Sequence, residues 1–71
     1  MIEINRIYRA NNIKSNTSAI LNIIPHNNGY KLQFIDNPYG YMQSIKYNTL
    51  KECVDYINNN YNYIRVITNG D

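Results

Sequence analysis

Apolar residues recur with helical spacing along one stretch of the sequence, residues 49–61. They stand three or four positions apart and fall on one stripe at about 100° per residue; they are Leu50, Cys53, Val54, Ile57 and Tyr61. Thr49 and Glu52 have the spacing of a capping box at the start of a helix. The asparagine run 58–60 predicts the end, because asparagine tolerates the left-handed conformation. The stretch predicts one amphipathic helix that needs an apolar surface to pack on.

Two segments with alternating apolar and polar residues, 17–25 and 30–36, flank Asn28-Gly29 and predict a β-hairpin. Asn-Gly is a strong signal for a two-residue type I′ turn, since both central residues need a positive φ. A turn at this position pairs Ile23 with Phe34. Alternation then divides the side chains between two faces. One face collects Leu21, Ile23, Tyr30, Leu32 and Phe34, and the other collects Ile20, Asn22, Ile24, Lys31, Gln33 and Ile35.

The remaining segments predict three more strands. Residues 2–9 alternate until the phase slips near Asn5-Arg6, which a β-bulge would explain; a loop is predicted to follow at Asn11 and Asn12. Residues 41–47 form a second hairpin with the preceding strand across a proline- and glycine-containing turn at 37–40. β-Branched residues favour a last strand at 63–68.

Together these elements predict an α+β fold, a small and mostly antiparallel sheet in ββββαβ order with one amphipathic helix on one face. All 71 residues, 1–71, are expected to form a single domain. The helix would pack on a floor of Leu21, Ile23, Leu32, Phe34, Ile45 and Tyr47. One alternative concerns residues 17–24, which would also suit a short helix that ends at Pro25.

Few groups in this sequence suit catalysis or metal binding. His26 is the only histidine and Cys53 the only cysteine, and they fall on different predicted elements, whereas a zinc site usually takes four ligands. We therefore expect no enzyme, no metal site and no cofactor. A lone cysteine on an apolar stripe is typical of a buried residue in a reducing compartment. Since no segment has the roughly 18 apolar residues of a membrane span, a cytoplasmic protein of a bacterial host, without membrane contact, is expected.

The sheet face away from the helix should be polar, yet it is predicted to include Ile20, Ile24, Ile35 and Met42. An apolar outer face on so small a protein indicates a partner or a second copy of the chain. Coverage of this face by the first or last strand is the alternative.

Tyrosine is the second indication of binding. The chain has eight tyrosines, a residue enriched at binding hot spots, although codon bias in an A/T-rich genome is an alternative explanation. Two of the tyrosines flank a glycine at the predicted turn, where a partner can reach them. The predicted partner-binding residues are Ile35, Tyr39, Tyr41 and Met42, with Lys31 and Lys46 as a charged rim.

Residues 29–60 run strand, glycine-containing turn, strand, and then Thr-x-x-Glu at the start of a helix. This order resembles the arm-binding domains of phage integrases and AP2-type DNA-binding domains. In those families the open sheet face lies in the DNA major groove, which implies a matching face of Lys31, Gln33, Ser44 and Lys46. One alternative function is therefore a nucleic-acid-binding module that also uses Arg6 and Arg9. Another is an oligomer that sequesters a nucleotide by stacking tyrosine on its base.

The asparagine-, isoleucine- and tyrosine-rich composition resembles that of small accessory proteins of phages and mobile elements. We expect a small non-enzymatic binding protein that docks on a bacterial host protein and blocks it, in the manner of anti-defence inhibitors. A homodimer at micromolar concentration is also expected, because a second copy would cover the apolar outer face.

Overall fold

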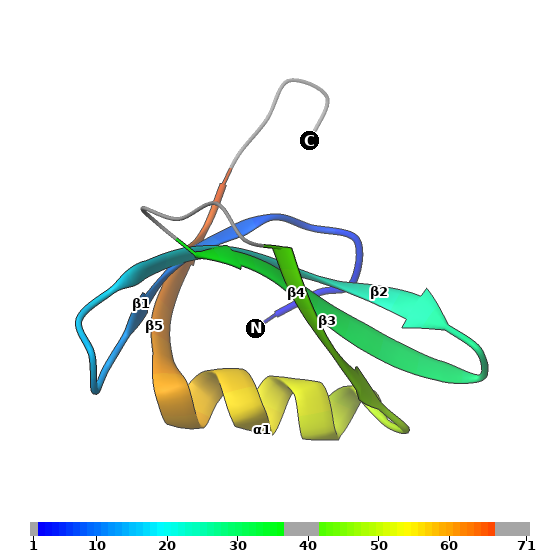
Figure 1. The fold of residues 1–71 in the computed structure, drawn as a ribbon. Helices are drawn as coiled ribbons and strands as arrows, with labels where there is room; N and C mark the ends of the chain where they lie inside the picture. The colour runs from blue at the N-terminus through cyan, green and yellow to red at the C-terminus, as the bar shows by residue number, and fades with distance from the viewer. Residues whose placement is uncertain (1, 37–41, 67–71) are drawn as a thin grey trace.

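The structure is a computed structural model that describes residues 2–36 and 42–66. These residues form one five-stranded sheet, in which every neighbouring pair is antiparallel, and one helix that packs on one side of it (Figure 1). The elements are β1 (Tyr8–Asn12), β2 (Ser18–His26), β3 (Gly29–Asp36), β4 (Met42–Tyr47), α1 (Leu50–Asn60) and β5 (Tyr61–Arg65). The order across the sheet is β4-β3-β2-β1-β5. The predicted α+β fold and its ββββαβ order are confirmed.

The hairpin of β2 and β3 turns one residue earlier than the Asn-Gly signal predicts. His26 pairs directly with Gly29, and Asn27 and Asn28 between them have φ angles of 45° and 64°. Two asparagines therefore supply the positive φ values that a type I′ turn needs. Gly29 is a strand residue, and a Cβ there would lie 2.5 Å from the backbone oxygen of Tyr47. Close approach of two backbones, and not the turn, requires this glycine.

The earlier turn changes the register of this hairpin by two residues. Ile23 pairs with Leu32, so the predicted pairing of Ile23 with Phe34 is wrong. Because side chains alternate with a period of two, the shift leaves every residue on its predicted face. The register of β3 with β4 is the predicted one, with Ile35 opposite Met42. The predicted turn at 37–40 lies outside the described residues. The alternative of a short helix at 17–24 is excluded, because β2 pairs on both sides.

The first strand was predicted too early in the chain. β1 begins at Tyr8, and the segment before it turns at Asn5, which has a φ of 60° and donates its amide to the Ile23 carbonyl at 2.7 Å. The predicted bulge is therefore a turn, since asparagine can adopt a positive φ. Asn11 and Asn12 were predicted to lie in a loop but instead complete β1. The Asn12 side chain accepts hydrogen bonds from two backbone amides, those of Lys14 and Ser15. The loop therefore begins after Asn12.

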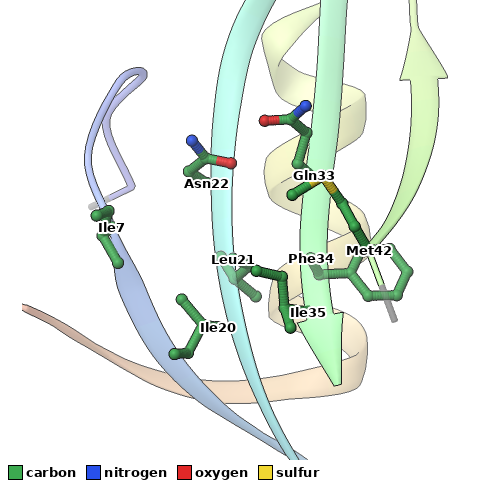
Figure 2. A pocket seen from close by; sticks show the side chains of 8 residues that line it. All are labelled: Ile7, Ile20, Leu21, Asn22, Gln33, Phe34, Ile35 and Met42. Atoms are coloured by element: carbon green, nitrogen blue, oxygen red, sulfur yellow. The ribbon is translucent and has the colours of Figure 1, made fainter. Parts of the chain in front are cut away.

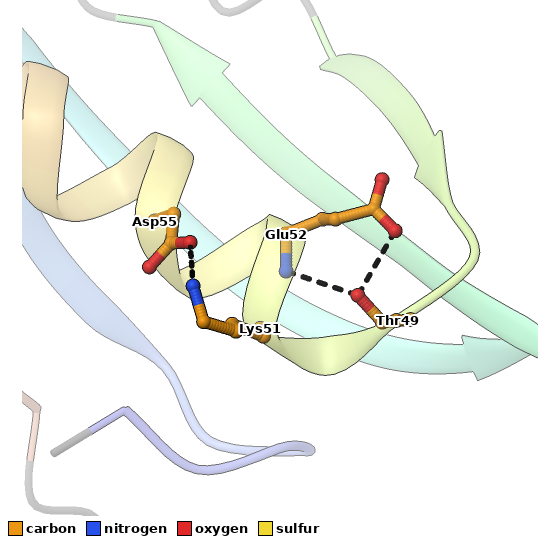
Figure 3. A network of polar contacts seen from close by, with 4 residues as sticks. All are labelled: Thr49, Lys51, Glu52 and Asp55. Carbon is orange, nitrogen blue, oxygen red and sulfur yellow. Dashed lines mark hydrogen bonds and ion pairs between the residues drawn. The ribbon is translucent and has the colours of Figure 1, made fainter.

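The start of α1 is the predicted one. Thr49 has an extended backbone and its Oγ1 accepts the Glu52 amide at 3.2 Å (Figure 3). The same hydroxyl donates to the Glu52 carboxylate at 2.9 Å. One free amide of the first turn is thereby satisfied, and a carboxylate is held at the positive end of the helix.

Replacement of Thr49 by alanine is expected to lower the free energy of unfolding by about 1 kcal/mol, because the first-turn amide loses its acceptor. Urea denaturation followed by far-UV circular dichroism measures the change. Thr49→Ser keeps the hydroxyl and is the matched control, with an expected change of a few tenths of a kcal/mol. Equal stability of the alanine and serine variants would contradict a role for this hydrogen bond.

The end of α1 differs from the prediction. None of the asparagines 58–60 has a positive φ, and the chain passes directly into β5 at Tyr61, whose amide donates to the Ile57 carbonyl. The Asn60 side chain donates to the Tyr56 carbonyl at 2.7 Å. Side-chain and strand amides thus satisfy carbonyls of the last turn without a left-handed residue. Consequently β5 begins at residue 61 and not at residue 63.

The core lies between α1 and the sheet face that the helix covers. Cys53 and Ile57 of the helix are fully buried, and Leu50 and Val54 are partly buried beside them. The predicted floor is confirmed, with Leu21, Ile23, Leu32 and Phe34 buried and Ile45 and Tyr47 partly buried. The core also holds residues that were not predicted for it, namely Ile2 before β1, Tyr8 and Ala10 of β1, and Ala19 of β2. The core therefore lies on the face of the sheet under α1, and the other face stays outside it.

Candidate binding surface on the open face of the sheet

The sheet face opposite α1, here called the open face, is not covered by any of the described elements (Figure 1). β1 and β5 extend the sheet sideways beyond β2. They therefore enlarge this face, and the alternative in which the first or last strand covers it does not hold for the described residues.

One row of side chains across the open face is mostly apolar. Strand pairing places Met42 beside Ile35, Ile35 beside Ile20, Ile20 beside Arg9, and Arg9 beside Ile64. Met42 is 67% exposed, Ile64 65% and Ile20 42%. These four apolar residues, called the apolar row, are interrupted only by Arg9. Large apolar side chains that lie adjacent and exposed across a sheet are typical of a binding surface.

The chemistry of the open face changes in steps along the strands. Two residues beyond the apolar row, Ser44, Gln33 and Asn22 are cross-strand neighbours that offer hydroxyl and amide groups. A further two residues along, Lys46 lies directly opposite Lys31; these two are called the lysine pair. At 3.3 Å per residue, the lysine pair lies about 13 Å from the apolar row.

A hollow of about 170 Å³ lies beside the apolar row. Its lining is Ile7, Ile20, Leu21, Asn22, Gln33, Phe34, Ile35 and Met42 (Figure 2). For comparison, a dry cavity of roughly 150 Å³ holds a benzene molecule, whereas sites for drug-sized ligands take about 300–1,000 Å³. The hollow is thus large enough for one apolar side chain of a partner and too small for a nucleotide.

All described charges on the strands of the open face are positive. They belong to Arg9, Lys31 and Lys46, and neither member of the lysine pair forms an ion pair among the described residues. The described carboxylates lie elsewhere. Glu3 lies 3.8 Å from both Arg6 and Arg65, while Glu52 and Asp55 are on α1, where Asp55 binds Lys51 at 2.6 Å (Figure 3). None of these three carboxylates therefore lies on a strand of the open face.

The described tyrosines belong to the opposite side of the sheet. Six of them are buried in the core or packed against it: Tyr8, Tyr30, Tyr47, Tyr56, Tyr61 and Tyr63. The rings of Tyr8 and Tyr63 meet edge to face with centroids 5.7 Å apart. Tyrosine thus serves as a core residue here, and no described tyrosine lies on the open face for a base to stack on.

The structure brings the predicted site residues together in two groups. Ile35 and Met42 are neighbours in the apolar row, and Lys31 and Lys46 form the lysine pair. Tyr39 and Tyr41 lie outside the described residues. Sequence reasoning missed Ile7 and Ile64, because the faces of β1 and β5 depend on how they pair with the rest of the sheet. The one available signal was residues 63–68, which are apolar at both alternating sets of positions.

Comparison with known proteins gives no relative from which to assign a function. No family model, curated protein or solved structure matches this chain. Within residues 2–36 and 42–66, no helix is long and apolar enough to cross a membrane. No group of three or more metal-ligating side chains occurs in the same part of the chain.

Cys53 is fully buried in the core, and burial raises the pKa of its thiol, with the nearby charge of Glu52 adding to the effect. A thiolate is the reactive form of cysteine, so this position suppresses thiol chemistry. Cys53 is therefore a packing residue of the core.

Stability should fall at alkaline pH because of this cysteine. Its folded pKa is raised, so its contribution is complete below the unfolded pKa of about 8.5 and is lost as the pH rises through the folded pKa. We expect the free energy of unfolding to decrease as the pH rises above about 8.5. Burial also raises the pKa of Tyr47. This tyrosine lowers the stability only above about pH 10, where its hydroxyl begins to ionise in the unfolded chain. Urea denaturation across this range measures the slope, and the slope should be smaller in Cys53→Ala. If the free energy of unfolding falls equally with pH in the wild type and in Cys53→Ala, the loss of stability does not come from Cys53.

Proposed function

We propose that this chain is a small non-enzymatic binding protein that docks on another protein through the open face of its sheet. The observation that carries the proposal is the apolar row, in which Met42, Ile20 and Ile64 are exposed to solvent along one line across the sheet. An apolar centre with a polar and charged surround is the usual composition of a protein interface. A standard protein interface takes roughly 800 Å² from each partner, and the accessible surface of the molecule is 5074 Å².

We further propose that the chain is encoded by a phage or mobile element and that docking inhibits a bacterial host protein, such as a defence protein. The small size and the asparagine-, isoleucine- and tyrosine-rich composition support this origin. Inhibition by docking requires no chemistry from the inhibitor, and the exposed apolar row of the open face supports a docking role.

A nucleic-acid-binding module is the second candidate function, and one observation favours it. The open face carries Arg9, Lys31 and Lys46, and a row of hydroxyl and amide groups lies next to the lysine pair. Lysine and arginine supply phosphate contacts, while amides read base edges. The run from β3 to α1, residues 29–60, also has the element order in which the sequence resembles DNA-binding domains.

Capture from bacterial lysate tests the proposed function with two variants that introduce the same residue on opposite sides of the molecule. Met42→Asp places a carboxylate in the apolar row, and Asn59→Asp places one on the exposed side of α1. The wild-type protein and Asn59→Asp should capture the same target, whereas Met42→Asp should lose it while its melting temperature stays unchanged. Equal capture by both variants would place the binding surface elsewhere.

Binding to duplex DNA at two salt concentrations separates the two candidate functions. A phosphate-dominated interaction weakens steeply as salt increases. We expect no DNA binding at physiological salt. Salt-sensitive binding that survives Met42→Asp and is lost when both members of the lysine pair are replaced by glutamine would favour the nucleic-acid module instead.

A further inference from the structure

The lysine pair is an arrangement that the fold alone does not favour. Lys31 and Lys46 are direct cross-strand neighbours on the same face of an antiparallel pair, and like charges in this position are destabilising. Neither ammonium group reaches a carboxylate among the described residues. A local conflict of this kind, without internal compensation, is typical of a functional site. An anionic group from outside the chain would convert the repulsion into two attractive contacts.

The surrounding charges point to the same kind of partner. Arg9 is the other charged residue on the described strands of the open face, and it too is positive. A second copy of the chain, packed with its open face against this one, would bring these cations together and offer no carboxylate from that face. Charge complementarity therefore favours a different molecule, and one with negative charge.

The hollow specifies a second feature of the partner. Its volume of about 170 Å³ and its lining, which includes Ile20, Ile35 and Met42, suit one large apolar side chain. The row of Ser44, Gln33 and Asn22 separates the apolar row from the lysine pair and can bind the backbone of a segment that lies along the strands. In an extended segment, a distance of about 13 Å corresponds to four residues.

We infer that the partner of the proposed function presents a protein segment with one large apolar residue and, about four residues away, carboxylates that meet the lysine pair. This inference rests on the proposed function and adds the chemistry of the partner to it. A protein fits these features better than a nucleic acid. The apolar row would gain no stabilising contact from a charged phosphate backbone, and no described aromatic residue on this face can stack on a base.

Selection from a displayed library of random linear peptides tests the inference without knowledge of the natural target. The wild-type protein should enrich peptides that combine a large apolar residue with two or more acidic residues. The most enriched peptide is then synthesised, together with a version in which every Asp and Glu is replaced by Asn and Gln. Fluorescence polarisation measures both peptides against four proteins, which are the wild type, Met42→Asp, the control Asn59→Asp, and the double variant Lys31→Gln, Lys46→Gln.

We expect the amide version of the peptide and the double lysine variant each to weaken binding on the order of tenfold or more. Their effects should not add, because they remove the same contacts. Met42→Asp should abolish binding and Asn59→Asp should leave it unchanged. A charge-reversed protein, Lys31→Glu with Lys46→Glu, should in turn bind a version of the peptide whose acidic residues are replaced by lysine.

Other outcomes separate failure of the inference from failure of the proposed function. Enriched peptides that lack acidic residues, bind the double lysine variant normally and are lost in Met42→Asp would overturn the inference and leave the proposed function standing. Binding that no open-face variant changes would overturn both. If no peptide is enriched, the inference that the protein recognises a linear segment of its partner is wrong. Self-association in sedimentation that Met42→Asp abolishes would identify a second copy as the occupant and overturn the acidic partner.

Discussion

Replacement of Phe34 by alanine is expected to lower the free energy of unfolding by about 3–5 kcal/mol. Phe34 is 7% exposed and belongs to the floor on which α1 packs. Its loss removes the transfer free energy of a phenyl ring and leaves a cavity that neighbouring side chains fill only in part. Because a domain of about 70 residues has only a few kcal/mol of stability, the variant should be largely unfolded at room temperature.

Met42→Ala is the matched control for this prediction, since Met42 lies on the other side of the same part of the sheet and is 67% exposed. Its stability should stay within about 0.5 kcal/mol of the wild type. Thermal unfolding followed by circular dichroism measures both variants. A melting temperature of Phe34→Ala equal to that of Met42→Ala would contradict the arrangement of core and open face described above.

Replacement of Gly29 by alanine is expected to destabilise the protein by about 1–3 kcal/mol, although alanine usually stiffens the unfolded chain and adds stability. The new Cβ would lie 2.5 Å from the backbone oxygen of Tyr47, so β3 and β4 would have to separate at this end. Since the conflict is with backbone, no side-chain rotation relieves it. Chemical denaturation measures the loss.

Asparagine at the same position distinguishes the observed turn from the one the sequence predicts. If residues 28 and 29 were the centre of the turn, Gly29→Asn would be tolerated, because asparagine adopts a positive φ at little cost. In the observed hairpin, Gly29→Asn should be at least as destabilising as Gly29→Ala. Asn28→Gly, which changes a residue with a φ of 64°, should by contrast stay within about 0.5 kcal/mol of the wild type. If Gly29→Asn is as stable as the wild type, the predicted turn with Asn28 and Gly29 at its centre would be supported instead of the observed one.

The two faces of the sheet differ in composition, and we propose that one serves stability and the other recognition. The face under α1 holds the buried residues and the described tyrosines, so substitutions there should change stability first. The open face holds the apolar row and the lysine pair, which support no described core contact and therefore suit a partner. Substitutions such as Met42→Asp can thus test binding without a large change in folding.

The sequence by itself determined the elements that rest on local chemistry. The helical spacing of Cys53 and Ile57, and the Thr49 and Glu52 side chains at its start, act within a few residues of one another, so periodicity and capping rules locate the helix. Strict alternation assigned Ile35 to the open face and Phe34 to the core. This assignment withstood an error in the turn, because a shift of two residues preserves the face of each side chain.

Only the tertiary structure decided the features that depend on distant parts of the chain. The need for glycine at position 29 follows from the approach of the Tyr47 backbone, and the two residues are far apart in the sequence. The end of α1 follows from the pairing of β5 with β1, which takes Tyr61 into the sheet before a left-handed cap can form. Pairing across five strands likewise places Ile64 in one row with Met42. Local pattern specifies which way a side chain points, whereas non-local backbone pairing specifies which side chains become neighbours, and the candidate binding surface is made of such neighbours.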